Sequence, residues 1–152
     1  MKIFLDTADV DLIEQYYGTG LIDGVTTNPT LIKKSGYDPE EVYRKIALIG
    51  VDDISMEIVT DDSYEFLKEG RRLKEKFGEI TTIKVPCTPE GLKGCKLLSK
   101  EGIRVNVTLI FSAAQAVLAS KAGAAYVSPF VGRVDDNSFD GLGLIKEIAD
   151  IY

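Results

Sequence analysis

Histidine is absent from this 152-residue sequence, so the side chain most often used for proton transfer near neutral pH is not available. Catalysis by a Ser-His-Asp or Cys-His arrangement is therefore excluded, as are the usual histidine-based zinc and non-haem iron sites. Any acid–base chemistry must come from Asp, Glu, Lys, Tyr or ordered water.

Basic residues are in the minority, with 18 Lys and Arg against 24 Asp and Glu. This balance disfavours a nucleic-acid partner, because neutralising phosphates requires clustered basic residues. No apolar run approaches the ~20 residues that cross a bilayer. The N-terminal residues MKIFLDTADVD become acidic too early for a secretory signal. We therefore expect a cytoplasmic protein with no membrane partner.

Cysteine is also scarce. Cys87 is expected at a strand end and Cys95 inside a helix, which favours two reduced thiols over a disulfide. The remaining composition, 45% hydrophobic and 28% charged, is ordinary for a globular protein. The length fits one domain that spans residues 1–152.

Short segments typical of β-strands alternate with helical patterns along the chain. The strand candidates are rich in Val, Ile and Thr and nearly continuous in apolar character, as expected for parallel strands that are buried on both faces. They are Lys2–Leu5, Gly24–Thr27, Ile54–Val59, Thr81–Val85, Arg104–Val107 and Ala124–Ser128. Helix signals lie between them: Asp38-Pro39 and Thr88-Pro89 start helices, and Gly78 and Gly123 are expected C-caps. Six β-then-α units result.

Strict alternation predicts an α/β fold with a parallel sheet, as either an open doubly wound sheet or a closed barrel. The first strand is followed by LDTADVD, which lacks the glycine-rich turn of nucleotide-binding open sheets and so favours a TIM-type (β/α) barrel. A complete eight-stranded barrel needs about 200 residues or more. We expect an incomplete barrel with about six of the eight βα units. A natural short form and a fragment both remain open.

Polar side chains collect where the expected strands end, which is the edge that carries the active site in parallel α/β folds. Lys84, between Ile83 and Val85, is the strongest candidate. Burial disfavours the ammonium form, and a neutral amine attacks a ketone to form an imine. The alternatives are a lysine that reaches the surface, or one that pairs with Glu57 or Asp6 for structural reasons.

Asp6 and Glu57 are candidates for the proton transfer that imine chemistry requires. Both lie in apolar sequence surroundings, where an unpaired carboxylate is unfavourable. For Asp6, a helix cap is an equally good interpretation. For Glu57, the alternative is an ion pair with Lys84, and the site interpretation is favoured.

Two further candidates have structural alternatives. Asn28 precedes Pro29, a pair that is common in turns. The planar guanidinium of Arg133 suits a phosphate, but pairing with Asp135 or Asp136 is favoured when the segment is taken alone. Strand residues two apart share a face, so three pairs are expected to point inward together: Thr26 with Asn28, Thr82 with Lys84, and Asn106 with Thr108.

Five segments in order along nearly the whole chain resemble the transaldolase family. The likeness is strongest to its short bacterial and phage-type members and to their fructose-6-phosphate aldolase relatives. The segments are LDTAD (5–9), GVTTNPTLI (24–32), KVPCTPEGL (84–92), VNVTLIFSAAQA (105–116) and AAYVSPFVGRVDD (124–136).

The resemblance implies a (β/α)₈ barrel and a class I mechanism, in which Lys84 forms a Schiff base with a ketose phosphate. Asp6 would handle the proton of the aldehyde oxygen during carbon–carbon cleavage. Glu57 and Thr108 would hold the water that moves protons during imine formation. No metal or organic cofactor is implied. The substrate-binding residues implied by the same segments are Thr27, Asn28, Asn106, Phe130 and Arg133, with the two asparagines on the dihydroxyacetone hydroxyls and Arg133 on the phosphate.

The transferase and aldolase branches of the family differ at three positions. Transaldolases typically have Glu, Asn and Phe where the aldolase branch has Gln, an apolar residue and Tyr, and this chain has Glu57, Asn106 and Phe130. The resemblance therefore favours transfer of a dihydroxyacetone unit between sugar phosphates, in the pentose phosphate pathway, over a fructose-6-phosphate aldolase-type lyase. A truncated, weakly active or inactive barrel with an assembly or binding role is the third interpretation.

Family members have two further βα units, whose seventh strand adds a Ser and an Arg to the phosphate pocket. A sheet without these units leaves its first and sixth strands as unpaired edges. We therefore expect a homo-oligomer, or an exchange of elements between copies, that covers both edges.

Overall fold

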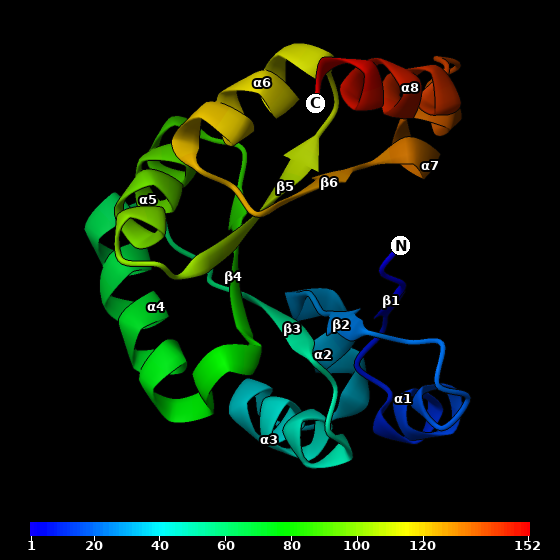
Figure 1. Ribbon diagram of the computed structural model, residues 1–152, viewed down its shortest axis with the longest axis vertical. Helices are drawn as coiled ribbons and strands as arrows, with labels where there is room; N and C mark the ends of the chain where they lie inside the picture. Colours follow the sequence, from blue (N-terminus) through cyan, green and yellow to red (C-terminus); the bar gives the residue numbers. More distant parts are fainter.

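One sheet of six parallel strands, curled into a half-barrel, forms the centre of the molecule (Figure 1). The computed structural model describes residues 1–152. Neighbouring strands in the chain are also neighbours in the sheet, in the order β1-β2-β3-β4-β5-β6. A doubly wound sheet would reverse its strand order part-way. The predicted incomplete TIM-type barrel is therefore confirmed.

All six predicted strands are present, with ends that differ by a few residues from those expected. The largest change is in the fifth, which continues past Val107 because its ladder with the sixth strand resumes at Ile110 after an irregularity. The strands are β1 (Phe4–Asp6), β2 (Gly24–Thr26), β3 (Asp53–Glu57), β4 (Thr81–Pro86), β5 (Arg104–Ile110) and β6 (Tyr126–Pro129).

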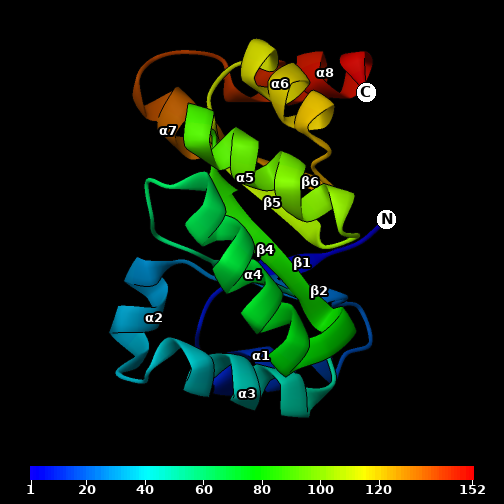
Figure 2. The same cartoon turned by 90° about the vertical axis from the view of Figure 1, so that its left-hand side faces the viewer.

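Helices cover the convex face of the sheet (Figures 1 and 2). The predicted caps are confirmed: the side chains of Asp38 and Thr88 accept hydrogen bonds from the first turns of their helices, and Gly78 and Gly123 occupy C-cap positions. The helices are α1 (Val10–Tyr17), α2 (Pro29–Ser35), α3 (Pro39–Ile49), α4 (Ser63–Phe77), α5 (Pro89–Lys100), α6 (Ala113–Ala122), α7 (Val131–Asp136) and α8 (Gly141–Ile151), with a 3₁₀ turn at Gly78–Ile80. No helix has the length and apolar character required to cross a bilayer.

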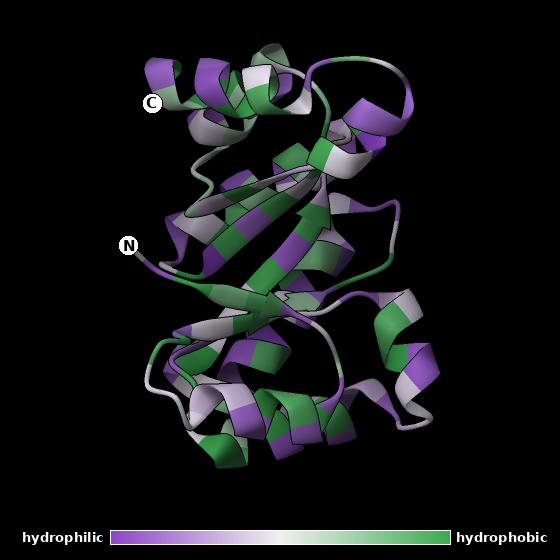
Figure 3. Ribbon diagram, turned by 90° about the vertical axis from the view of Figure 1, so that its right-hand side faces the viewer, coloured by the Kyte–Doolittle hydropathy of each residue, from purple (hydrophilic) through white to green (hydrophobic).

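The hydrophobic core lies between the sheet and these helices, and the central strands turn mostly polar side chains to the concave face. In β4, Ile83 packs toward Gly70 of α4, while Thr82 and Lys84 point to the concave side. Figure 3 looks onto the open side of the half-barrel and shows hydrophobic and hydrophilic segments alternating along the strands. The predicted burial on both faces is confirmed for β3, β4 and β5, where the side chains that point to the concave face are buried although most of them are polar.

A cluster of interior side chains closes the end of the half-barrel where the strands begin. The rings of Phe4 and Tyr126 meet edge to face, 5.6 Å between centroids. The hydroxyl of Tyr126 donates to Asp53 Oδ2 at 3.0 Å, and Arg104 pairs with the same oxygen at 2.9 Å. Burial is the main reason why the pKa of Tyr126 is raised. These contacts link β6 to β1 and to β3 across the interior, although β1 and β6 do not pair with each other.

Both cysteines are free thiols, as predicted, with Cys87 half-buried and Cys95 buried. Burial raises the pKa of Cys95 to about 11, so this thiol stays protonated and unreactive near neutral pH.

Gly91 allows the first turn of α5 to approach the end of β4. A Cβ at this position would lie 2.0 Å from the carbonyl oxygen of Pro86, which is backbone and cannot move aside. We predict that Gly91→Ala lowers the free energy of unfolding by about 1–3 kcal/mol through overpacking. Gly132→Ala is the matched control, because no atom lies within 4 Å of its Cβ position, and it should raise stability by about 0.5–1 kcal/mol.

Urea denaturation of the two variants measures the difference. A Gly91→Ala protein as stable as the parent would show that the close approach of α5 to β4 is not required.

Candidate functional site

A pocket of about 510 Å³ lies at the carboxyl ends of the strands and beside α7; we call it the strand-end pocket. Six of the nine predicted site residues line it. The full lining is Asp6, Thr26, Asn28, Lys84, Thr108, Ser128, Pro129, Phe130, Val131, Gly132, Arg133 and Asp136.

Lys84 is buried in the wall of this pocket, with 7% of its side-chain surface exposed. Its Nζ donates to the carbonyl oxygen of Thr27 at 2.9 Å and lies 3.2 Å from Glu57 Oε2. The predicted burial is confirmed, and a lysine that reaches the surface is excluded. Both partners are oxygen acceptors, so the two contacts hold the Lys84 nitrogen in one position in the pocket wall.

Glu57 is the nearest base because the β3–β4 register places it directly beside Lys84. Its side chain is 20% exposed, yet Glu57 does not line the strand-end pocket. The ion pair that sequence reasoning offered as the alternative is present. The pair and a proton-transfer role use the same contact, so both interpretations remain compatible.

Asp6 ends β1 at the mouth of the pocket and accepts a hydrogen bond from Thr26 Oγ1 at 2.8 Å. The helix-cap interpretation was wrong: the N-cap of α1 is Asp9, whose side chain accepts from the Leu12 amide. The expected apolar surroundings were also wrong, because Asp6 is exposed on the open side of the half-barrel.

Asn106 is held on the concave face of β5 by two serines. Its Nδ2 donates to Ser55 Oγ at 3.2 Å, and its Oδ1 accepts from Ser128 Oγ at 2.8 Å. Asn106 is buried beside the β4 strand of Lys84 and does not itself line the pocket. Ser128 lines the strand-end pocket but was not predicted as a site residue. The sequence signal that could have identified it is a polar residue at the end of the sixth strand.

Thr108 presents a buried hydroxyl with no hydrogen-bond partner in the protein. It lies where the β5–β6 register shifts, and the next residue, Leu109, has a φ of +60°. A left-handed conformation is unfavourable for a side chain of this size and is typically retained at functional sites. Thr108 lines the strand-end pocket, and its hydroxyl oxygen is buried there with no partner in the protein.

The two predicted residues that follow β2, Thr27 and Asn28, make different contacts, and only Asn28 lines the pocket. The Thr27 hydroxyl donates to the Ser55 carbonyl at 2.9 Å, and Thr27 does not line the pocket. Its backbone carbonyl contacts Lys84 instead. Asn28 combines both interpretations offered for it, because its side chain caps α2 by accepting from the Leu31 amide while Asn28 also lines the pocket.

Arg133, on α7, forms no ion pair, although pairing with Asp135 or Asp136 was favoured for the isolated segment. Asp135 instead accepts from the Gly141 amide at 2.9 Å, at the start of α8. The expected pairing of Arg133 with Asp135 was therefore wrong, because the Asp135 carboxylate accepts from a backbone amide instead. The ring of Phe130 packs at a tilt against that of Phe111, with 5.5 Å between centroids.

The pocket therefore combines an amine next to a base, a second carboxylate, one hydroxyl without a protein partner and an unpaired guanidinium. This set can bind a polyhydroxylated, anionic carbonyl compound and move protons around its carbonyl carbon. No group of three or more Cys, Asp or Glu side chains is placed to hold a metal ion.

The family model described as "Transaldolase/Fructose-6-phosphate aldolase" matches residues 3–152. The chain belongs to this family. The resemblance inferred from the five segments is confirmed.

Curated members of the transaldolase/fructose-6-phosphate aldolase family match the chain over its whole length. A probable transaldolase from Nitrosopumilus maritimus (strain SCM1) is 51% identical, and the chain covers 68% of that protein. Probable transaldolases from Methanococcus vannielii and Sphingopyxis alaskensis are each 55% identical, with 70% of each protein covered.

Among solved structures, the carboxyl transferase domain of Rhizobium etli pyruvate carboxylase aligns with a TM-score of 0.54 and 16% identity, covering 97% of this chain and 33% of that one. Its Y628A form with pyruvate aligns with a TM-score of 0.55 at the same identity and coverage. At this identity, the likeness concerns the fold alone.

Proposed function

We propose that this protein is a class I transaldolase, which transfers a dihydroxyacetone unit from a ketose phosphate to an aldose phosphate through a Schiff base on Lys84. The main support is the placement of the Lys84 amine, buried in the pocket wall and 3.2 Å from the Glu57 carboxylate. Family membership agrees with this chemistry, as do relatives named probable transaldolase. We place the reaction in the pentose phosphate pathway of the cytoplasm.

Imine formation begins when the Lys84 ammonium passes a proton to Glu57. The neutral amine attacks the ketose carbonyl carbon, and a proton moves from nitrogen to oxygen to give a carbinolamine. Glu57 returns its proton to the departing hydroxyl, so water leaves and a protonated imine remains. In sum, ammonium and ketone give iminium and one water, with Glu57 again a carboxylate. The free hydroxyl of Thr108 supports this step by holding the water that carries protons.

Cleavage of the next carbon–carbon bond requires a base on the sugar hydroxyl. Asp6 is the remaining carboxylate at the pocket mouth beside Thr26, and we assign it this role. The bond's electron pair moves into the iminium to give an enamine, while Asp6 takes the hydroxyl proton and the aldehyde departs. An acceptor aldehyde reverses these steps.

The remaining predicted residues bind the sugar phosphate. Arg133 suits the phosphate because its guanidinium has no protein carboxylate partner. Asn28 and Asn106 are assigned to the dihydroxyacetone hydroxyls, with Asn106 held in one orientation by its serines. Thr27 holds Lys84 through its carbonyl. Phe130, together with Glu57 and Asn106, favours transfer over lyase activity.

Lys84 is tested by chemical trapping. Borohydride reduction in the presence of fructose 6-phosphate should add a three-carbon unit to Lys84, because reduction fixes the imine left after cleavage. Intact mass and peptide mapping locate the adduct. Lys84→Met should give none, and Lys93→Met, which removes an exposed lysine, should keep it. A parent protein that gives no adduct at any pH from neutral to alkaline contradicts the proposal.

Asp6→Asn should separate imine formation from cleavage. Without the base, the rate of transfer should fall by about 10²–10⁴. The amine is untouched, so borohydride should now trap the whole six-carbon sugar phosphate on Lys84. A three-carbon adduct formed at the parental rate would show that another group removes the hydroxyl proton.

The open edges of the sheet support a homo-oligomer. β1 and β6 each pair on one side only, which leaves backbone donors and acceptors free to pair with another chain. We propose that residues 1–152 form one barrel-type domain and that a second copy covers these edges. Light scattering should give a mass above 16.6 kDa that rises with concentration. A monomer at high concentration would contradict this.

A further inference from the structure

The two partners of the Lys84–Glu57 ion pair border different cavities. Lys84 lines the strand-end pocket, whereas Glu57 lines a separate pocket of about 370 Å³ between α3 and α4. The lining of this α3–α4 pocket is Asp38, Pro39, Glu40, Tyr43, Glu57, Ile58, Val59, Glu69, Arg72 and Leu73. The pair, with 3.2 Å between Nζ and Oε2, therefore forms part of the wall between the two cavities.

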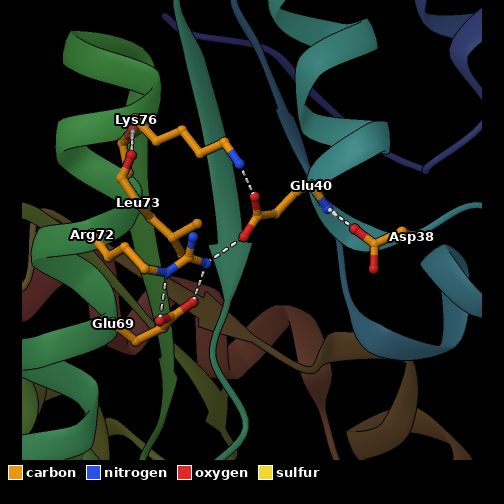
Figure 4. A network of polar contacts seen from close by, with 7 residues as sticks. Asp38, Glu40, Glu69, Arg72, Leu73 and Lys76 are labelled. Carbon is orange, nitrogen blue, oxygen red and sulfur yellow. Dashed lines mark hydrogen bonds and ion pairs between the residues drawn. The ribbon is translucent and has the colours of Figure 1, made fainter.

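The rim of the α3–α4 pocket is a chain of ion pairs between the two helices. Glu40 of α3 accepts from both Arg72 and Lys76 of α4, and Arg72 also pairs with Glu69 at 2.6 Å (Figure 4). These side chains are partly exposed, so the pocket meets solvent at this rim. Their charges are already paired with one another, which leaves no free charge to hold an anionic ligand.

The inner wall of the pocket is neutral apart from Glu57. Tyr43 is buried there, and loss of hydration on burial raises its pKa to about 12, so its hydroxyl stays protonated at neutral pH. Ile58 and Leu73 are buried apolar neighbours. Glu57, whose side chain is 20% exposed, is therefore the charged residue of this inner wall, and water is the occupant that suits an opening whose rim charges are already paired.

We infer that the α3–α4 pocket is a solvent route to Glu57, through which water and protons reach the Lys84–Glu57 pair while a sugar phosphate fills the strand-end pocket. This inference rests on the proposed imine chemistry. Each imine that forms releases one water, and each imine that is hydrolysed consumes one. A bound sugar covers Lys84 from the strand-end side, and Glu57 remains in contact with solvent from the other side.

The route can be tested by blocking each pocket in turn. Val59 lines the α3–α4 pocket and is 77% exposed, so Val59→Trp narrows the opening without disturbing the core. Gly132 lines the strand-end pocket with no atom within 4 Å of its Cβ position, so Gly132→Trp obstructs that side instead. Leu48→Trp, at an 83% exposed position of α3 that lines neither pocket, is the matched control.

The first measurement needs no substrate. A water-soluble carbodiimide with glycinamide modifies accessible carboxylates, and peptide mass spectrometry reports the extent at Glu57. Labelling of Glu57 should fall severalfold in Val59→Trp and stay at the parental level in Gly132→Trp and Leu48→Trp. The exposed carboxylate of Glu79 serves as an internal reference. A fall in Gly132→Trp with none in Val59→Trp would overturn the inference.

The second measurement follows the rate at which fructose 6-phosphate becomes trapped on Lys84. Val59→Trp should slow trapping by about tenfold while the final yield is unchanged, because proton transfer is impaired and sugar binding is not. Gly132→Trp should lower the yield itself. Val59→Trp trapping at the parental rate contradicts the route. If the parent protein traps no sugar, the proposed function fails, and Glu57 labelling alone still decides whether the route is open.

Discussion

The contact between the Lys84 amine and the Glu57 carboxylate depends on the register of two adjacent strands. A parallel ladder places Glu57 of β3 opposite Lys84 of β4 on the concave face, and the carbonyl of Thr27 supplies a second acceptor. A shift of one residue in either strand would turn the side chain of that strand, Glu57 or Lys84, toward the helices and separate the two groups. The outer residues Met56 and Ile83 are fully buried against those helices, so hydrophobic packing on one face fixes the polar geometry on the other.

Side chains at the amino ends of the strands explain why the pocket and its polar groups lie at the carboxyl ends. Phe4, Asp53, Arg104 and Tyr126 fill the interior where the strands begin and connect strands that are not neighbours in the sheet. Gly24 makes room for this cluster, since a Cβ there would lie 2.4 Å from the Phe4 ring. The strand-end pocket lies at the opposite, carboxyl ends of the strands, beside the segments that carry the other polar groups.

Much of this arrangement could be predicted from local sequence. Strand and helix positions follow from short apolar patterns and from caps such as Thr88, and the inward direction of Lys84 follows from the two-residue repeat of a strand. Contacts between distant segments could not be predicted. The roles of the Thr27 carbonyl and the Ser128 hydroxyl, and the unpaired state of Arg133, depend on how strands and helices meet in space.

The three-residue ladder between β1 and β2 sets how firmly Asp6 is held. Asp6 is at the last position of this ladder, on a strand with a neighbour on one side only, and a single side-chain hydrogen bond from Thr26 orients its carboxylate. Local opening of an edge strand requires much less free energy than global unfolding. Anything that orders this margin also orders the carboxylate, so turnover per molecule is coupled to the local order of the first strand while the buried amine keeps its place.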